Sequence, residues 1–386
     1  MRTLQQPLFT PDTEWIPPDR LPDLSGHMEI AIDLETRDPN LMTMGSGSVR
    51  GDGEVVGIAV AVEGWSGYFP IAHEGGGNMD RALVLDWFEE LLHNTATKIF
   101  HNAMYDVSWI RSMGFSINGG IVDTMVAASL CNENRWSFTL DSVAKDYIGM
   151  RKKEKLLQDA AKEWGINPKA EMWRLPAPFV GEYAEKDAEI TLKLYHALQH
   201  EITKQDLWDV FNMETNLFPC LVDMKFKGVR VDVAKAHAVK TQLTTQEGKL
   251  LRDIKKMAGF DVEIWAAASI AKAFEKSNLP YDRTDKGAPS FTKNFLATHP
   301  HELPKLINQA REINKANTTF IDTILKHEHK GRIHSDINQI RSDDGGTVTG
   351  RFSYSNPNLQ QIPARHKELG PLIRSLFVPE EGHKWG

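Results

Sequence analysis

Residues 27–36 read HMEIAIDLET, and this stretch shows how the first half of the chain is built. Every second residue from 28 to 34 is apolar, as expected of a β-strand that packs against a core. Asp33 and Glu35 lie two positions apart, so their carboxylates share one face of that strand. Two carboxylates held close together repel each other and lose hydration, which is costly unless a cation compensates. The pattern therefore predicts a core strand that also contributes to a cation site.

The flanking sequence adds strands and helices around this first strand. Two apolar runs, VVGIAVAV and GYFPIA, are separated by EGWS and predict a hairpin. Amphipathic spacing predicts a helix over 79–93, and TKIF at 97–100 predicts a short strand followed by a helix from about residue 102. Further helices follow, the last over about 179–204. This order predicts an α/β or α+β domain of about 200 residues.

The second half of the chain differs from the first in its pattern of apolar residues and in its net charge. Apolar residues at helical spacing predict long helices over about 207–224, 234–257 and 303–325, with no obvious strands between them. Residues 1–200 carry a net charge of −11 and residues 201–386 a net charge of +4, which together give the −7 of the whole chain. Halves that differ so much in charge are expected to have different tasks.

The composition of the chain limits the classes of protein to which it can belong. A chain of 386 residues with 41% hydrophobic and 25% charged residues is typical of globular proteins with two or three domains, which excludes wholesale disorder. Two cysteines, Cys131 and Cys220, are too few for a disulfide framework and lack zinc-ligand spacing, so a cytoplasmic location is expected. The N-terminal sequence does not have the pattern of a signal peptide, and no stretch approaches the ~18 apolar residues of a membrane span.

Two more patterns extend the cation-site hypothesis. Asn102 and Asp106 in HNAMYDVSWI, and Tyr183 and Asp187 in YAEKDAEI, lie four residues apart and so share a helix face. Each pattern alone also fits an ordinary surface: a solvated strand face, a helix N-cap, a half-buried tyrosine. Together, four carboxylates from three elements would suit two oxygen-preferring divalent ions, Mg²⁺ or Mn²⁺.

The order IDLET, HNAMYD, YAEKD resembles the three motifs of 3′→5′ exonucleases of the tyrosine subtype. The resemblance covers about residues 28–200 and implies a ribonuclease-H-like fold, a mixed sheet with flanking helices. It implies that Asp33, Glu35 and Asp187 bind one metal ion, and that Asp33 also binds a second ion near Asp106. Tyr183 would orient the attacking water, since a phenol with a pKa near ~10 is a poor base at neutral pH.

A second resemblance lies near the C-terminus. The stretch TGRFSYSNPNLQQIPAR at 349–365 looks like the start of the polymerase domain in family A, polymerase I-like DNA polymerases. With it the resemblance runs from about residue 28 to the end: exonuclease, mainly helical thumb, and a short palm stub. The compact N-terminal region, without a 5′-nuclease domain, looks phage-like, which places the protein in a host cytoplasm.

This second resemblance implies contacts with DNA. Arg351 could reach minor-groove acceptors, which are nearly the same for every base pair. Asn358 and Gln360 could donate to base and sugar acceptors at a primer terminus, and Arg365 could face a phosphate. The first resemblance, to the exonucleases, implies that Asn102 contacts the terminal nucleotide. An ordinary turn at 356–358 and a solvated surface are the alternatives for these residues. Five cations of the thumb helices could bind duplex phosphates: Lys249, Lys255, Lys256, Arg311 and Lys315. Charge runs on helices, however, are more often solvated faces.

The sequence departs from the family in two places. RSDDGG at 341–346 looks like an insertion, and the chain reaches VPEEGHKWG without the palm aspartates of a polymerase site. We therefore expect the polymerase site to be incomplete in this chain. The expected divisions are an N-terminal extension (1–26), a 3′→5′ exonuclease domain (27–204), a helical thumb region (205–345) and the start of the palm (346–386).

The leading hypothesis is the N-terminal part of a family A replicative polymerase with a proofreading 3′→5′ exonuclease. Its partners would be a single-stranded 3′ end and primer–template DNA, with no membrane. A second chain carrying palm and fingers, or a processivity factor, is a further candidate partner. One alternative is a stand-alone 3′→5′ exonuclease of RNA processing or repair. The other is a non-enzymatic DNA-clamping half that assembles with a palm-containing chain.

Overall fold

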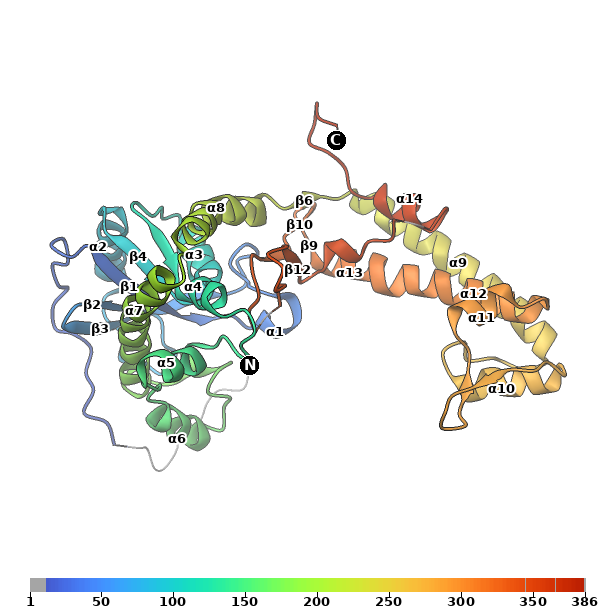
Figure 1. The fold of residues 1–386 in the computed structure, drawn as a ribbon, viewed down its shortest axis with the longest axis horizontal. Coiled ribbons are helices and arrows are strands. Elements are labelled where there is room, and N and C mark those ends of the chain that lie inside the picture. The colour runs from blue at the N-terminus through green and yellow to red at the C-terminus, as the bar shows by residue number, and fades with distance from the viewer. Residues whose placement is uncertain (1–11, 344, 365, 385–386) are drawn as a thin grey trace. The chain divides into compact units, whose positions relative to one another are not determined.

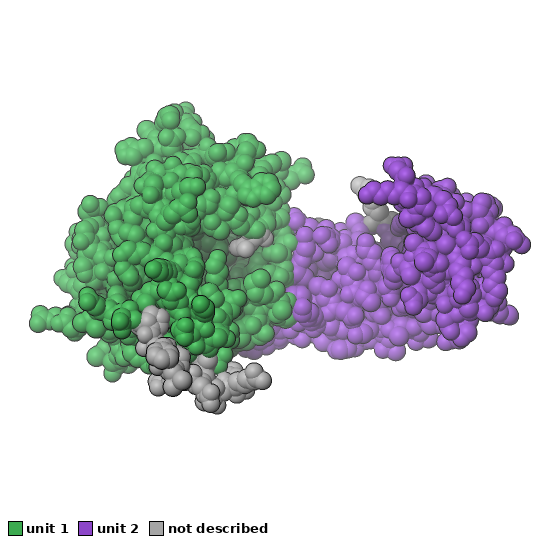
Figure 2. Space-filling view, turned by 90° about the horizontal axis from the view of Figure 1, so that it is seen from below, with its two compact units in different colours: residues 1–227, 335–356 green, residues 228–334, 357–386 purple. Residues whose placement is uncertain are grey.

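The computed structural model describes residues 12–343, 345–364 and 366–384, which form two compact units. Unit 1 comprises Met1–Lys227 and Ser335–Asn356, and unit 2 comprises Gly228–His334 and Pro357–Gly386, as far as these residues are described (Figure 2). This division differs from the four segments expected from the sequence, because a helix beyond residue 204 and a hairpin after residue 334 both pack in unit 1. The limits of the functional domains stay a prediction.

Unit 1 is built on a five-stranded mixed sheet in the order β3-β2-β1-β4-β5. Strand β1 pairs antiparallel with β2 and parallel with β4, and β4 pairs parallel with β5. The mixed sheet with flanking helices is confirmed, whereas the short strand β5 was not expected. The strands are β1 (Glu29–Arg37), β2 (Glu54–Val62), β3 (Trp65–Pro70), β4 (Thr97–Phe100) and β5 (Ile121–Asp123).

Helices cover both faces of this sheet. One core combines Ala31, Ala59 and Tyr68 of the sheet with residues of α4, α5, α6 and α7, and α7 lies along that face (Figure 1). The other core packs Ile30 and Ile32 against α2 and α3. The helices are α1 (Leu41–Met44), α2 (Arg81–His93), α3 (Ala103–Ser112), α4 (Thr124–Cys131), α5 (Leu140–Ile148), α6 (Lys155–Trp164) and α7 (Gly181–Lys204), with 3₁₀ turns η1 (Met172–Arg174) and η2 (Ala177–Phe179).

Helix α8 (Trp208–Lys227) also belongs to unit 1, where it buries Phe218 in the second core. The hairpin of β11 (Asp336–Asn338) and β12 (Ser353–Ser355) is attached to it. The buried Lys225 of α8 pairs with Asp336 at 2.9 Å, and the Gln339 amide donates to the backbone carbonyl of Glu214 at 2.7 Å. Residues 335–356 are thus held to unit 1 by buried polar contacts.

Unit 2 is mainly helical, as expected, but it also contains short strands. The region 303–325, expected as one helix, is α12 (Glu302–Lys315), a π-helical segment η3 (Ala316–Ile321) and α13 (Asp322–His327). Within η3, the buried Asn317 donates to the hydroxyl of Thr244 on α9 at 3.0 Å, a contact that this wider turn accommodates. No helix in the described part of the chain is long and apolar enough to cross a membrane.

The remaining elements of unit 2 are α9 (Val233–Ala258), α10 (Ala267–Lys276), α11 (Lys293–Thr298), α14 (Leu369–Arg374), the 3₁₀ turn η4 (Leu359–Gln361), and the strands β6 (Val229–Arg230), β7 (Asp282–Arg283), β8 (Pro289–Ser290), β9 (Glu328–His329) and β10 (Arg332–Ile333).

Candidate active site

Strand β1 holds Asp33 and Glu35 on the sheet face that α7 covers. Both alternate with Leu34, which lies in the opposite core. The residues opposite them on β2 are small: Ala59 pairs with Asp33 and Gly57 with Glu35. The room that Gly57 leaves is taken by the buried Tyr68, whose hydroxyl oxygen would clash with a Cβ at position 57 and which packs beside the two carboxylates. The two carboxylates share one face of the sheet, as their spacing predicted.

Asp106 approaches β1 from α3. Its Oδ1 accepts a hydrogen bond from the backbone N–H of Leu34 at 2.9 Å, and the side chain is buried. The start of α3 is anchored by Asp123 at the end of β5, which accepts from the N–H groups of Asn102 at 3.0 Å and Ala103 at 2.8 Å. Asn102 has a φ of 68°, a left-handed conformation that asparagine tolerates. This anchored turn positions Asp106 next to β1.

Helix α7 carries Tyr183 and Asp187, one turn apart. Asp187 is only 2% exposed, and its Oδ2 accepts a charged hydrogen bond from Nζ of Lys152. The same Nζ lies 3.3 Å from the Tyr183 hydroxyl oxygen and 5.1 Å from the centroid of the tyrosine ring. Oδ1 of Asp187 has no hydrogen-bond partner in the described part of the protein. A buried carboxylate oxygen with free lone pairs fits a metal ligand.

The four acids Asp33, Glu35, Asp106 and Asp187, called the acidic cluster below, act on one another electrostatically. Burial and the nearby Asp187 raise the pKa of Asp33 to about 7, while Lys152 opposes the rise. Burial and the Asp33 charge raise the pKa values of Glu35 and Asp106 well above their usual range. One ammonium cannot neutralise this much buried negative charge, so the acidic cluster favours additional cations.

The donor set of the acidic cluster suits hard divalent ions, which prefer carboxylate oxygens. Among the described residues, no three acidic, histidine or cysteine side chains are already grouped around one point as metal ligands. The cation that the structure does place there is the ammonium of Lys152. Burial and the carboxylate of Asp187 raise the pKa of Tyr183 well above its usual value, so its hydroxyl stays protonated at neutral pH.

Three residues beside the acidic cluster were missed by the sequence reasoning. Lys152 is hidden within the charge run RKKEK, and Asp123 is the last residue of a strand of only three residues. His101 bridges the hydroxyl of Thr124 at 2.8 Å and the carbonyl of Phe138 at 2.9 Å, and burial lowers its pKa to about 3. The only available signal was position: His101 directly precedes Asn102, and Lys152 lies between the second and third motifs.

The candidate DNA contacts near the C-terminus fall in different units. Arg351 is exposed in unit 1, and its backbone is held in a turn by two hydrogen bonds with the Thr347 hydroxyl, at 2.8 and 3.1 Å. Asn358 and Gln360 belong to unit 2, where Oδ1 of Asn358 accepts from the backbone N–H of Gln360 at 3.0 Å and so stabilises a turn. Arg365 lies outside the described residues.

Arg311, one of the candidate phosphate-binding cations of the thumb, makes structural hydrogen bonds within unit 2. Its Nε donates to the carbonyl of Ile264 at 2.5 Å and its Nη1 to the carbonyl of Phe291 at 2.8 Å. The guanidinium therefore holds two loops of unit 2 together. The expectation that Arg311 contacts phosphates stays a prediction.

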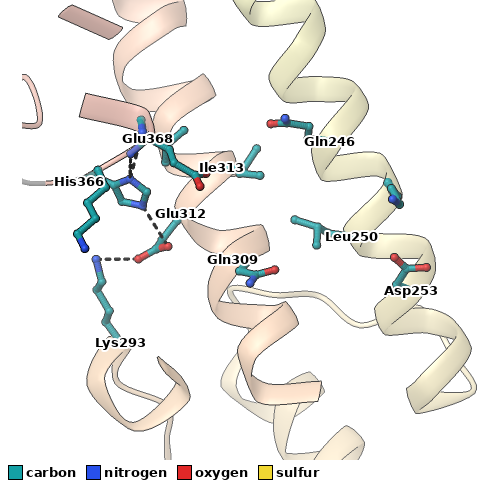
Figure 3. A pocket seen from close by; sticks show the side chains of 12 residues that line it. Gln246, Leu250, Asp253, Lys293, Gln309, Glu312, Ile313, His366 and Glu368 are labelled. Atoms are coloured by element: carbon teal, nitrogen blue, oxygen red, sulfur yellow. Dashed lines mark hydrogen bonds and ion pairs between the residues drawn. The ribbon is translucent and has the colours of Figure 1, made fainter. Parts of the chain in front are cut away.

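Unit 2 also contains a hollow of ≈ 810 Å³ between α9, α12 and the segment before α14 (Figure 3). One of its acids is paired with two basic side chains: Glu312 accepts from Lys293 at 2.8 Å and from His366 at 3.4 Å. The residues that line it include both acidic and basic side chains, and the acidic ones are not gathered as those of the acidic cluster are. We therefore place the candidate active site at the acidic cluster.

Comparison with known sequences identifies the class of protein. Residues 10–203 match a family described as 3′-5′ exonuclease, and residues 233–385 match DNA polymerase family A. The chain belongs to the family A DNA polymerases and carries a 3′-5′ exonuclease domain.

The relatives include DNA polymerases of phages and of bacteria. The chain is 35% identical to a DNA-directed DNA polymerase of Pseudomonas phage M6, in an alignment that covers all of this chain and 60% of the relative. It is 32% identical to DNA polymerase DpoZ of Salmonella phage PMBT28, covering 94% of this chain and 60% of that protein. The chain thus spans about three-fifths of the length of these relatives.

A solved structure supports the fold over nearly the whole chain. The structure described as the POL domain of Pol1 from M. smegmatis, in complex with DNA primer-template and dNTP, superposes with a TM-score of 0.70 at 20% identity. The match covers 93% of this chain and 57% of that chain. At this identity the likeness establishes the shared fold.

Proposed function

We propose that this chain proofreads DNA, removing 3′-terminal nucleotides by hydrolysis that depends on two divalent metal ions. The observation that carries the proposal is the acidic cluster, in which the buried Glu35, Asp106 and Asp187 and the partly buried Asp33 lie near enough to act on one another electrostatically, with too little positive charge beside them. An exonuclease of this kind needs such a surplus, because it must bind cations next to an anionic phosphodiester. The membership of residues 10–203 in the 3′-5′ exonuclease family agrees with this reading.

Each residue of the site has a proposed role. Asp33, Glu35 and Asp187 would hold one Mg²⁺ or Mn²⁺ ion, and Asp33 with Asp106 a second. Such ions, when bound, supply a water of lowered pKa and neutralise charge on the leaving oxygen. Tyr183, kept protonated by its raised pKa, aims the water by hydrogen bonding and does not remove a proton.

The remaining roles concern DNA. Asn102 lies at the N-terminal end of α3, and its side chain would contact the terminal nucleotide. Arg351, Asn358 and Gln360 would contact a primer–template, as would Arg365. The family A match over residues 233–385 supports this assignment, and it disfavours a stand-alone nuclease of RNA processing. The cytoplasm of a bacterial host is the proposed location.

The test is release of nucleotides from a labelled 3′ end by the full chain. The double variant Asp33→Ala/Glu35→Ala should lose at least about 10³-fold of the Mg²⁺-dependent rate, because removing ligands abolishes metal-assisted chemistry. A matched control is Asp159→Ala/Glu163→Ala, which removes two exposed acids from α6 and should keep the wild-type rate. Undiminished release by the first variant would overturn the proposal.

The same assay separates DNA proofreading from RNA processing. Single-stranded DNA and RNA of identical sequence are compared at equal concentrations, with a 3′ mismatch on a primer–template as a third substrate. We expect DNA to be degraded faster than RNA, and the mismatched primer faster than the matched one. A preference for RNA would favour the alternative function.

A further inference from the structure

A short irregular segment between α5 and α6 carries three consecutive cations, each of which meets an acid. Arg151 lies 3.7 Å from Asp141, and Lys153 lies 2.6 Å from Glu182. These two pairs are exposed, with Lys153 at 58% and Glu182 at 46% side-chain exposure. The pair between Lys152 and Asp187 differs, because the side chains are 18% and 3% exposed. The middle cation alone is therefore turned inward.

The inward cation occupies the place where the acidic cluster is most in need of charge. Its ammonium bonds Oδ2 of Asp187, lies 3.3 Å from the Tyr183 hydroxyl, and acts on the charges of both Asp33 and Glu35. The second oxygen of Asp187 makes no hydrogen bond in the described part of the chain. Lys152 thus satisfies only part of what the acidic cluster can bind.

The backbone around Lys152 allows this ammonium to leave. Residues 151–154 are in neither helix nor strand. The segment is tied down by the backbone N–H of Lys152, which donates to Oδ1 of Asp141 at 3.1 Å, and by the two exposed ion pairs. Exposed pairs contribute roughly 0–1 kcal/mol each, so they hold the segment only weakly. The main cost of turning Lys152 outward is the loss of its buried pair with Asp187, and a divalent ion bound at Asp187 would compensate that loss.

We propose that Lys152 is a built-in counter-ion, which holds Asp187 while no divalent ion is bound and competes with that ion for the same carboxylate. The inference rests on the proposed function, because it assumes that the acidic cluster binds divalent metal. A cation that must be displaced weakens metal binding, since two positive charges would otherwise lie within a few ångströms of each other. The residue therefore sets the metal concentration at which the site fills, and it acts through Asp187 as a positioning residue.

The experiment measures Mn²⁺ binding to the full chain by calorimetry, together with thermal unfolding in EDTA. Lys152→Met keeps the length of the side chain but removes its charge. We expect Mn²⁺ to bind at least about tenfold more tightly to this variant, and the metal-free protein to melt at a lower temperature. Lys153→Met, which removes the neighbouring exposed charge, should match the wild type in both measurements. Lys152→Arg should restore the wild-type melting temperature in EDTA.

The possible outcomes separate this inference from the proposed function. If Asp187→Asn abolishes Mn²⁺ binding while Lys152→Met leaves both affinity and metal-free stability unchanged, the counter-ion role is wrong and the metal centre stands. If neither wild type nor any variant binds Mn²⁺, both are wrong. Should Lys152→Met fail to fold, Lys152→Gln retains an N–H donor for Asp187 without the charge, and the same tightening of Mn²⁺ binding is expected of it.

Discussion

The carboxyl groups of the acidic cluster in unit 1 and the carboxyl group of Glu312 in the hollow of unit 2 have pKa values that are shifted in opposite directions. In unit 1, burial and mutual repulsion raise the pKa values of Asp33, Glu35 and Asp106. In unit 2, hydrogen bonds from Lys293 and His366 outweigh partial burial and lower the pKa of Glu312. The second arrangement is complete in itself, whereas the first gains stability when further cations bind. A group of buried acids whose charge the neighbouring side chains do not balance therefore indicates a functional site.

The largest effect is expected from removing the anchor of the acidic cluster. Asp123→Ala leaves the backbone N–H groups of Asn102, Ala103 and Met125 without their acceptor. The free energy of unfolding should fall by about 3 kcal/mol, since buried donors lose their partners at once. Urea denaturation of the full chain measures this, with Asp159→Ala as the control. A loss below about 1 kcal/mol would show that the cluster needs no such support.

A pH titration tests whether the acidic cluster really opposes folding when metal is absent. The pKa of Asp33 is about 7 in the folded protein against a usual 3.8, so the folded state holds this proton more tightly. The resulting stability is fully present below about pH 4 and is lost as the pH rises through about 7. Asp33→Asn removes this loss. We expect wild type in EDTA to lose at least about 1.4 kcal/mol more than Asp33→Asn between pH 5 and 7.

That difference is measured by urea unfolding at several pH values in that window. Asp159→Asn, which changes an exposed acid on α6, should follow the wild-type curve. Parallel curves for wild type and Asp33→Asn would remove the contrast between the two units. Addition of Mg²⁺ should bring wild type back towards its stability at low pH, because the cations replace the protons as neutralising charge.

The smallest effect is expected in unit 2. Glu312→Gln breaks ion pairs in which Lys293 is 71% exposed and His366 is 31% exposed. Exposed pairs of this kind contribute little, so the free energy of unfolding should change by less than about 1 kcal/mol. Nucleotide release should stay at the wild-type rate, because Glu312 has no part in the acidic cluster. A large loss of activity in the nuclease assay would place part of the site in unit 2.

Long regular patterns in the sequence predicted most of the elements of unit 1. Strand β1, helix α2, strand β4 and helix α7 lie where apolar spacing placed them, because each buries one face against a core. Strand β5 has only three residues, too few for a periodic signal. Strands β11 and β12 pair although a long loop separates them, and local sequence patterns do not identify a pairing partner that lies far along the chain.

The residues of the candidate site also differ in whether regular spacing in the sequence reveals them. Asp33 and Glu35, or Tyr183 and Asp187, are related by strand or helix spacing, so the sequence alone places each pair on one face. Lys152 has no such spacing, since it lies outside regular structure and its neighbours are also cations. Only the folded structure shows that Lys152, and not its neighbour Lys153, points towards the acidic cluster.

Unit 1 is assembled from two stretches of chain that synthesis delivers at different times. Residues 228–334, all of them in unit 2, emerge from the ribosome between α8 and the hairpin of β11 and β12. Until Asp336 has been made, the buried Lys225 lacks that carboxylate. The exonuclease sheet can therefore form early, whereas α8 completes its contacts only after most of unit 2 exists. Vectorial synthesis thus gives the unit that contains the acidic cluster two folding stages.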